Sequence, residues 1–366
     1  MDYCGAKKKG DNLMLNGRCS LKCRLLLLVV TLAFVAHGLA ALPAMAADSV
    51  KLRFTTYNPP RGMEGQMANW LTDEISKRSG GQISFEIYFG GSLLKARETL
   101  KGIQAGTADM GFIFVPYFPR ELPAWTVAEP FLKGPVAPEK RAEFFWALYS
   151  EAPELKNALA KWNQKLVAIH VFGKHSVGGN KPLNNLSDLK GLKVRCAGGY
   201  DALHMSALGA NIVFLKGAEV YSAMQKGAID ANYTPVTSYF KYKLYEIGKN
   251  HHLMVIPQFI GSVGLITINQ SSFNKLSPNQ QKAVLEAGKK YSVIESAKIG
   301  TLEKEYSAKM AKAGVKLVNI TKDQVLKWAQ DSEEESKAKW IEKTQGKAGG
   351  KAFLEKAERL LERFQD

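Results

Sequence analysis

Strand-like and helix-like segments alternate along this chain, and this alternation is the feature that most constrains its fold. Residues 50–56 alternate between apolar and polar side chains, as a half-buried strand does, and residues 64–79 carry an apolar stripe at helical spacing. Further strands are expected at residues 83–88, 108–114, 166–171, 192–196, 211–214 and 263–269. This order is typical of an α/β fold with a largely parallel sheet.

The last third of the chain changes character and is mostly helical. Residues 278–312 are rich in Ala, Glu and Lys and predict one long helix. A short strand at residues 315–318 is followed by a helix over residues 321–343 and a charged amphipathic helix near the end. Near the start, Gly90-Gly91-Ser92 is expected to turn directly into a helix, with Ser92 as its N-cap.

The N-terminal segment has the parts of a secretory signal peptide. Six basic side chains precede the apolar run of residues 25–36, and Ala44-Met45-Ala46 supplies a small-x-small cleavage site. A membrane anchor needs roughly 20 apolar residues, but His37, Gly38 and Pro43 interrupt this run. We therefore expect residues 1–46 to be removed on export to the periplasm. No later stretch is apolar enough to span a bilayer.

Cysteine content and charge limit the remaining classes. Beyond residue 46 only Cys196 remains, so no disulfide can form within the mature chain. The net charge of +16 falls to about +12 without the leader. Lys and Arg are spread among acidic residues at helical spacing, which indicates a solvated surface and no nucleic-acid partner. The excess positive charge would attract anionic solutes over a long range.

The sequence has no recognisable catalytic or metal-binding motif. The histidines lack metal-ligand spacing, and the chain has no nucleophile elbow, phosphate loop or Gly-x-Gly-x-x-Gly. Cys196, with no base near it in the sequence, is expected to be a small core residue. We therefore expect no enzymatic activity, no metal and no cofactor.

Ligand sites of open α/β sheets lie at the carboxyl ends of the strands. Three segments occupy that place: the loop from Tyr57, the run from Phe114 to Phe118, and the run from Arg195 to Tyr200. An arginine at a strand end can bind a carboxylate through two parallel charge-assisted hydrogen bonds. From spacing alone, Arg195 could equally be a surface arginine or form a structural salt bridge.

Four segments together resemble the solute-binding subunits of TRAP transporters (tripartite ATP-independent periplasmic, DctP-type). The stretch Leu189-Lys-Gly-Leu-Lys-Val-Arg is similar to the arginine motif of that family. Residues 89–111, residues 209–214 with 219–230, and residues 273–281 are similar to its other motifs, in the same order. The resemblance covers essentially all of residues 50–330.

The resemblance implies an α/β fold with two lobes, hinge strands and a long interlobe helix. Lobe I would comprise residues 47–172 and 262–300, lobe II residues 173–261, and residues 301–366 would form a C-terminal helical region packing on the lobes. It also implies that Arg195 pairs with a ligand carboxylate, and that the protein passes its ligand to TRAP membrane permease subunits. We expect a monomer.

Departures from the family pattern bear on the ligand. In the stretch Ala231-Asn-Tyr-Thr-Pro of this chain, Tyr233 and Thr234 stand where many members carry other residues. A second basic anchor for the ligand would be either Lys174 or Lys181. Aromatic walls suit a ligand with an apolar or aromatic body. The predicted ligand-binding residues are Arg195, Tyr57, Asn58, Phe114, Tyr117, Lys174, Tyr233 and Thr234, with Phe112 and Phe240 expected in the core.

The function predicted is capture of a small organic acid, a monocarboxylate, by an arginine–carboxylate clamp and its delivery to a permease. Two alternatives remain open at this point. The same fold could serve as a ligand sensor for a membrane signalling receptor, or as the scaffold of a periplasmic enzyme.

Overall fold

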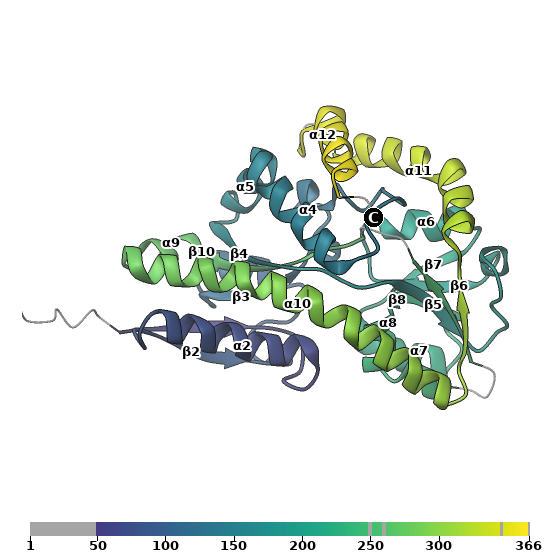
Figure 1. Cartoon of the computed structure of the whole chain (residues 1–366), viewed down its shortest axis with the longest axis horizontal. Helices are drawn as coiled ribbons and strands as arrows, with labels where there is room; N and C mark the ends of the chain where they lie inside the picture. The colour runs from purple at the N-terminus through teal and green to yellow at the C-terminus, as the bar shows by residue number, and fades with distance from the viewer. Residues whose placement is uncertain (1–48, 248–250, 258–260, 345–346, 365–366) are drawn as a thin grey trace, which may run out of the picture. The chain divides into compact units, whose positions relative to one another are not determined.

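The structure, a computed structural model, describes residues 49–247, 251–257, 261–344 and 347–364. The predicted signal peptide, residues 1–46, lies outside the described residues. The compact unit that follows, Ser49–Asp366, contains two β-sheets surrounded by helices (Figure 1).

Each sheet is assembled from strands distant in sequence. The first sheet has the strand order β2 (Ile83–Tyr88), β1 (Val50–Thr55), β3 (Met110–Phe114), β10 (Gly264–Asn269) and β4 (Gln164–His170). The second has the order β11 (Lys316–Asn319), β9 (His252–Ile256), β5 (His175–Gly179), β8 (Ala231–Pro235), β6 (Lys193–Cys196) and β7 (Asn211–Phe214). The α/β class was predicted correctly, and all eight predicted strands are present. The sequence did not predict β5, β8 and β9.

Both sheets are mixed, but only one strand in each runs against the others, so the predicted largely parallel character holds for most strands. β1 pairs in parallel with β2 and β3, whereas β10 runs antiparallel to both of its neighbours. In the second sheet, β5 is antiparallel to β8 and β9. The reversed strands are those through which the chain enters each sheet after a crossing: β5 follows the crossing from β4, and β10 follows the return from β9.

The helices cover the faces of these sheets. They are α2 (Met63–Arg78), α3 (Thr99–Gln104), α4 (Pro138–Glu151), α5 (Pro153–Ala160), α6 (Asp201–Ala207), α7 (Gly217–Gln225), α8 (Val236–Lys241), α9 (Gln270–Asn274), α10 (Pro278–Lys312), α11 (Lys322–Thr344) and α12 (Gly350–Glu362). In the described part of the chain, no helix combines the length and the apolar character that crossing a membrane requires.

The long helix α10 has the predicted bounds and links the two sheets (Figure 1). Ser277 caps its first turn, with Gln280 completing a capping box. The helix packs against β4 and α2 on the side of the first sheet and against α8 and β11 on the side of the second. One helix therefore packs against elements of both sheets.

Side chains of α10 also hold the segment that crosses from β4 to β5. The backbone N–H groups of Ile169 and Val171 donate to Ser292 and Glu295 at 3.0 and 3.4 Å, and that of Lys174 donates to Glu303. These bonds satisfy backbone groups that would otherwise lack sheet partners where the chain leaves one sheet for the other.

The expected helix start at Ser92 was wrong. Residues 92–98 form turns, and α3 begins only at Thr99. The turn packs the side chain of Leu94 over the helix at Gly102, where a Cβ atom would lie 2.3 Å from the nearer Leu94 methyl carbon. Burial of Leu94 against α3 therefore prevails over the local capping signal.

The C-terminal helices pack on the body of the protein. Trp340 of α11 is fully buried, and its indole N–H donates to the Thr126 hydroxyl at 2.9 Å. On α11, Glu333 accepts the backbone N–H of Leu132 at 2.8 Å. In α12, Phe353 and Leu354 belong to the main hydrophobic core. This packing contributes core contacts that residues 49–320 alone would lack.

Candidate functional site

A pocket lies where the carboxyl ends of β1, β3, β6 and β8 face one another. Its empty space is about 650 Å³ when its opening to solvent is counted. The lining residues are Tyr57, Asn58, Glu64, Phe112, Phe114, Tyr117, Phe172, His175, Arg195, Ala197, Gly217, Tyr233, Thr234, Pro235, Ser238, Lys241, Tyr242 and Ser262. Both sheets contribute to it, as the two-lobe fold requires.

Seven of the eight predicted site residues line this pocket, and the exception is Lys174. Lys174 lies in the crossing segment, where its backbone N–H donates to Glu303 of α10. The alternative anchor, Lys181, pairs with Asp230 at 3.0 Å and is not a lining residue either. Besides Arg195, the structure brings the basic side chain of Lys241 to the pocket, which the sequence did not single out.

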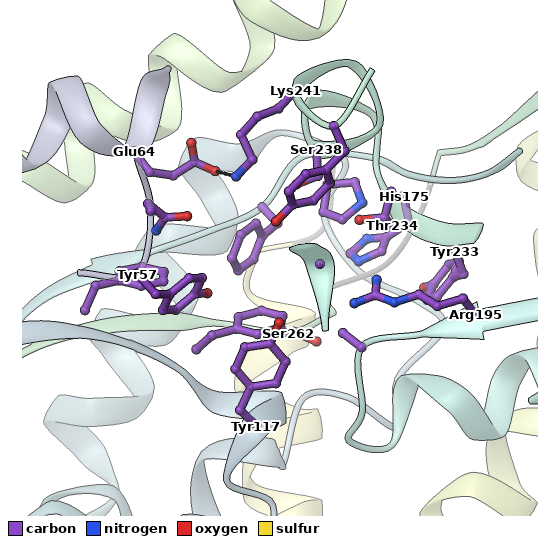
Figure 2. A pocket seen from close by; sticks show the side chains of 18 residues that line it. Tyr57, Glu64, Tyr117, His175, Arg195, Tyr233, Thr234, Ser238, Lys241 and Ser262 are labelled. Atoms are coloured by element: carbon purple, nitrogen blue, oxygen red, sulfur yellow. Dashed lines mark hydrogen bonds and ion pairs between the residues drawn. The ribbon is translucent and has the colours of Figure 1, made fainter. Parts of the chain in front are cut away.

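Arg195 enters the pocket from the end of β6 with part of its guanidinium already bonded. Its Nε and Nη2 both donate to the carbonyl oxygen of Leu215, at 2.9 and 2.6 Å, and Nη1 lies 3.4 Å from Oδ1 of Asn232. The side chain is 3% exposed. Since one edge is fixed by the Leu215 carbonyl, the edge formed by Nη1 and Nη2 points into the pocket (Figure 2). That edge has the spacing of a carboxylate.

The electrostatics keep Arg195 charged and its neighbour Tyr117 protonated. Burial lowers the pKa of Arg195 from its ordinary value, but an arginine remains protonated in folded proteins. Burial raises the pKa of Tyr117, whose hydroxyl lies against Arg195 and the backbone N–H of Gly217. Tyr117 can therefore donate a hydrogen bond toward an anion held by Arg195.

Aromatic rings form a continuous wall on the side of the first sheet. The ring of Tyr57 lies 5.7 Å from Phe112 and 6.0 Å from Tyr117. The ring of Phe114 meets those of Tyr117 and Phe172 edge to face, at 5.0 and 5.2 Å. Phe112 was expected only in the core; it is 5% exposed, yet it also lines the pocket. Such a wall can bury an apolar ligand body.

A second charged group stands on the other side of the pocket from Arg195 (Figure 2). Nζ of Lys241, at the end of α8, lies 2.7 Å from Oε1 of Glu64, in the first turn of α2. The α2 turn can take this place because Gly65 lets the Pro59-Pro60 loop pack on it; a Cβ there would lie 2.3 Å from the Pro59 carbonyl oxygen. No motif in the sequence pointed to this pair.

The pair stays ionised in its buried surroundings. Burial alone would raise the pKa of Glu64, but the nearby ammonium of Lys241 outweighs it, so the pKa of Glu64 is lowered. Burial alone would lower the pKa of Lys241, but the nearby Glu64 carboxylate outweighs it, so the pKa of Lys241 is raised. Burial also lowers the pKa of His175 to about 3, so this ring is neutral. The described lining residues therefore carry one net positive charge.

The loops that end β3 and β6 meet beside the pocket. Gly198 has a φ of +138°, and a Cβ at this position would lie 2.7 Å from the carbonyl oxygen of Pro116. Only glycine combines this backbone conformation with so close an approach. The loops that follow β3 and β6 thus pack closely against each other at this edge of the pocket.

The pocket presents charged and aromatic groups that can bind a ligand. The residues that the structure describes contain no group of three or more His, Cys, Asp or Glu side chains placed to hold a metal ion. Cys196, the expected core cysteine, is fully buried and does not line the pocket. What the pocket offers is a fixed cation, an aromatic wall and a charge-balanced opposite side.

Comparison with known proteins identifies the family. Residues 54–343 match the family described as bacterial extracellular solute-binding protein, family 7 (DctP). The chain is 27% identical over 257 residues to a solute-binding protein of Albidiferax ferrireducens, covering 70% of this chain and 75% of the relative. It is 24% identical over 292 residues to the 2,3-diketo-L-gulonate-binding periplasmic protein of Escherichia coli, covering 79% and 87%.

Solved structures share the fold at lower identity. A TRAP solute-binding protein from Rhodoferax ferrireducens, in complex with copurified benzoate, has a TM-score of 0.76 at 20% identity, covering 86% of this chain and 98% of that one. A Bordetella pertussis solute receptor that binds pyroglutamic acid has a TM-score of 0.74 at 21% identity, covering 85% and 99%. These likenesses confirm the two-lobed fold. Since the family match spans most of the chain, this protein belongs to bacterial extracellular solute-binding protein family 7, the DctP family of TRAP solute-binding proteins, and is not an enzyme.

Proposed function

We propose that this protein captures a small organic acid in the periplasm and delivers it to the membrane permease of a TRAP transporter. The ligand is a monocarboxylate with an apolar or aromatic body. Its carboxylate pairs with the inward edge of Arg195, and its body lies against the rings of Tyr57, Phe114 and Tyr117. The observation that carries the proposal is the buried guanidinium of Arg195, which Leu215 fixes along its Nε–Nη2 edge and which lines a pocket with one net positive charge.

The known ligands of similar proteins support this chemistry. A Nostoc relative, 28% identical over half of this chain, is a monocarboxylate 2-oxoacid-binding periplasmic protein. A marine metagenome protein with the same fold, at a TM-score of 0.76 and 18% identity, is specific for aromatic acids and holds 3-hydroxybenzoate. Both kinds of ligand combine one carboxylate with a compact body, which is what the pocket of this chain would accommodate.

In this proposal the protein is exported by residues 1–46 and acts as a monomer. The lobe of residues 47–172 and 262–300 closes on the lobe of residues 173–261, while residues 301–366 pack on both. Closure is driven only by contacts that the ligand makes better in the closed state than in the open one. The Arg195 clamp comes from one lobe and the aromatic wall from the other, so a bound acid would bridge them.

A thermal-shift screen of the protein without residues 1–46 tests the proposed ligand class. The panel contains aliphatic and aromatic monocarboxylates, dicarboxylates and neutral sugars. A ligand present at about 100 times its Kd stabilises the native state by about 2.7 kcal/mol. We expect monocarboxylates with apolar or aromatic bodies to raise Tm by several degrees. Stabilisation by neutral sugars alone would reject the proposal.

A further inference from the structure

We propose that the Glu64–Lys241 ion pair determines specificity by giving the wall opposite Arg195 no net charge. The pocket then admits an acid whose other end carries a neutral hydrogen-bonding group and rejects one with a second carboxylate. This inference rests on the proposed function, since it assumes that Arg195 holds the first carboxylate.

The ion pair lies where it can contact the end of a ligand remote from Arg195. Lys241 and Glu64 line the same pocket as Arg195, and Figure 2 shows them on the opposite side. Their side chains are only 19% and 14% exposed, and Nζ and Oε1 are 2.7 Å apart. The ammonium also lies 5.0 Å from the centre of the Tyr242 ring. A ligand that reaches across from Arg195 must therefore meet this pair.

A second carboxylate on the ligand would find no net countercharge at this wall. The positive charge of Lys241 is already matched by Glu64, which would also repel another carboxylate directly. Removing a carboxylate from water is costly unless a countercharge and hydrogen bonds replace the water. Like charges brought together at a binding surface weaken association strongly. A dicarboxylate would therefore bind more weakly than a monocarboxylate of the same shape.

A neutral polar group has suitable partners there. An ammonium has three donors and a carboxylate about four acceptor sites, so one mutual hydrogen bond leaves both able to bond again. The pair can thus accept from a ligand hydroxyl or amide N–H through Glu64 and donate to its oxygen through Lys241. The ligand class inferred is a monocarboxylate with a hydroxyl or amide at the end remote from its carboxylate.

Matched ligands and matched charge variants test the inference. The ligand pairs are 3-hydroxybenzoate with isophthalate, and 4-hydroxybutyrate with succinate, each titrated calorimetrically into wild type, Glu64→Gln, Lys241→Gln and the double variant. Glu64→Gln is nearly isosteric and leaves Lys241 without its partner. We expect it to shift the ratio of Kd values at least about tenfold in favour of the dicarboxylate.

The other variants fix the interpretation. Lys241→Gln leaves the Glu64 charge unmatched and should weaken monocarboxylate binding at least about tenfold. The double variant restores a wall without net charge, so its Kd ratio should return to within about threefold of the wild-type ratio. A ratio unchanged by Glu64→Gln would overturn the inference while leaving the proposed function intact if Arg195 is still required. A wild type that prefers dicarboxylates would overturn both the inference and the proposed monocarboxylate ligand. Wild type binding no member of either pair would overturn both.

Discussion

Replacement of Arg195 by alanine is expected to weaken monocarboxylate binding by about 2–5 kcal/mol, which is roughly 30-fold to several thousand-fold in Kd. The reason is that the carboxylate would be buried beside Tyr117 and the aromatic wall with no countercharge. Arg195 is only 3% exposed, so few water molecules could solvate the ligand carboxylate once the arginine side chain is removed. Isothermal titration calorimetry of the purified variant measures the loss.

Two further variants separate the clamp from general charge effects. Arg195→Lys keeps the charge but cannot form two parallel hydrogen bonds, so we expect its affinity to lie between those of wild type and the alanine variant. Arg120→Ala removes an equal charge from an exposed position and should leave Kd within about twofold. Since Arg195 also bonds to Leu215, the unliganded Tm of each variant is measured first. A folded alanine variant with wild-type affinity would return Arg195 to a purely structural role.

The second large effect concerns stability and the seating of α10 on β4. Gly288 faces the strand so closely that a Cβ atom would lie 1.9 Å from the carbonyl oxygen of Val167. Gly288→Ala must therefore push the helix away from the strand, and we expect the free energy of unfolding to fall by about 1–3 kcal/mol. This loss should appear even though alanine is the better helix former by about 0.5–1 kcal/mol.

The same helix provides a matched control. Gly300 also lies within α10, but a Cβ atom there would meet nothing within 4 Å. Gly300→Ala should therefore raise the free energy of unfolding by about 0.5–1 kcal/mol. Chemical denaturation followed by circular dichroism compares the two variants. Equal effects at both positions would show that α10 is not seated on β4 as described.

Local patterns in the sequence predicted much of the fold. The alternating strand at residues 50–56 and the long helix at residues 278–312 were found because each has an unambiguous period. β5 was not, because Gly178 and Gly179 read as strand breakers. Both glycines are needed by close packing instead: a Cβ would lie 2.4 Å from the Tyr239 hydroxyl at Gly178 and 2.2 Å from the Asp230 carbonyl at Gly179. Such contacts have no local signature.

Some residues of the site could likewise be predicted from local sequence patterns, and others could not. Arg195 and Tyr57 could be anticipated because Arg195 lies near the carboxyl end of one strand and Tyr57 just after that of another, where ligand sites are expected. Glu64 and Lys241 could not, because they stand 177 residues apart on different helices, and each reads as an ordinary charged position. Their pairing depends on how α2 and α8 are placed along α10, which is a property of the whole fold. Sequence patterns therefore located the cation and the aromatic wall but missed the opposite side of the pocket.

The central claim, that this pocket recognises a carboxylate, is tested most directly by titrating wild-type protein with an acid and its own amide. 3-Hydroxybenzoate and 3-hydroxybenzamide have nearly the same shape and differ in charge at the group that would meet Arg195. We predict that the acid binds at least about 100-fold more tightly, because only the carboxylate satisfies the buried guanidinium. Equal affinities, or tighter binding of the amide, would contradict the account.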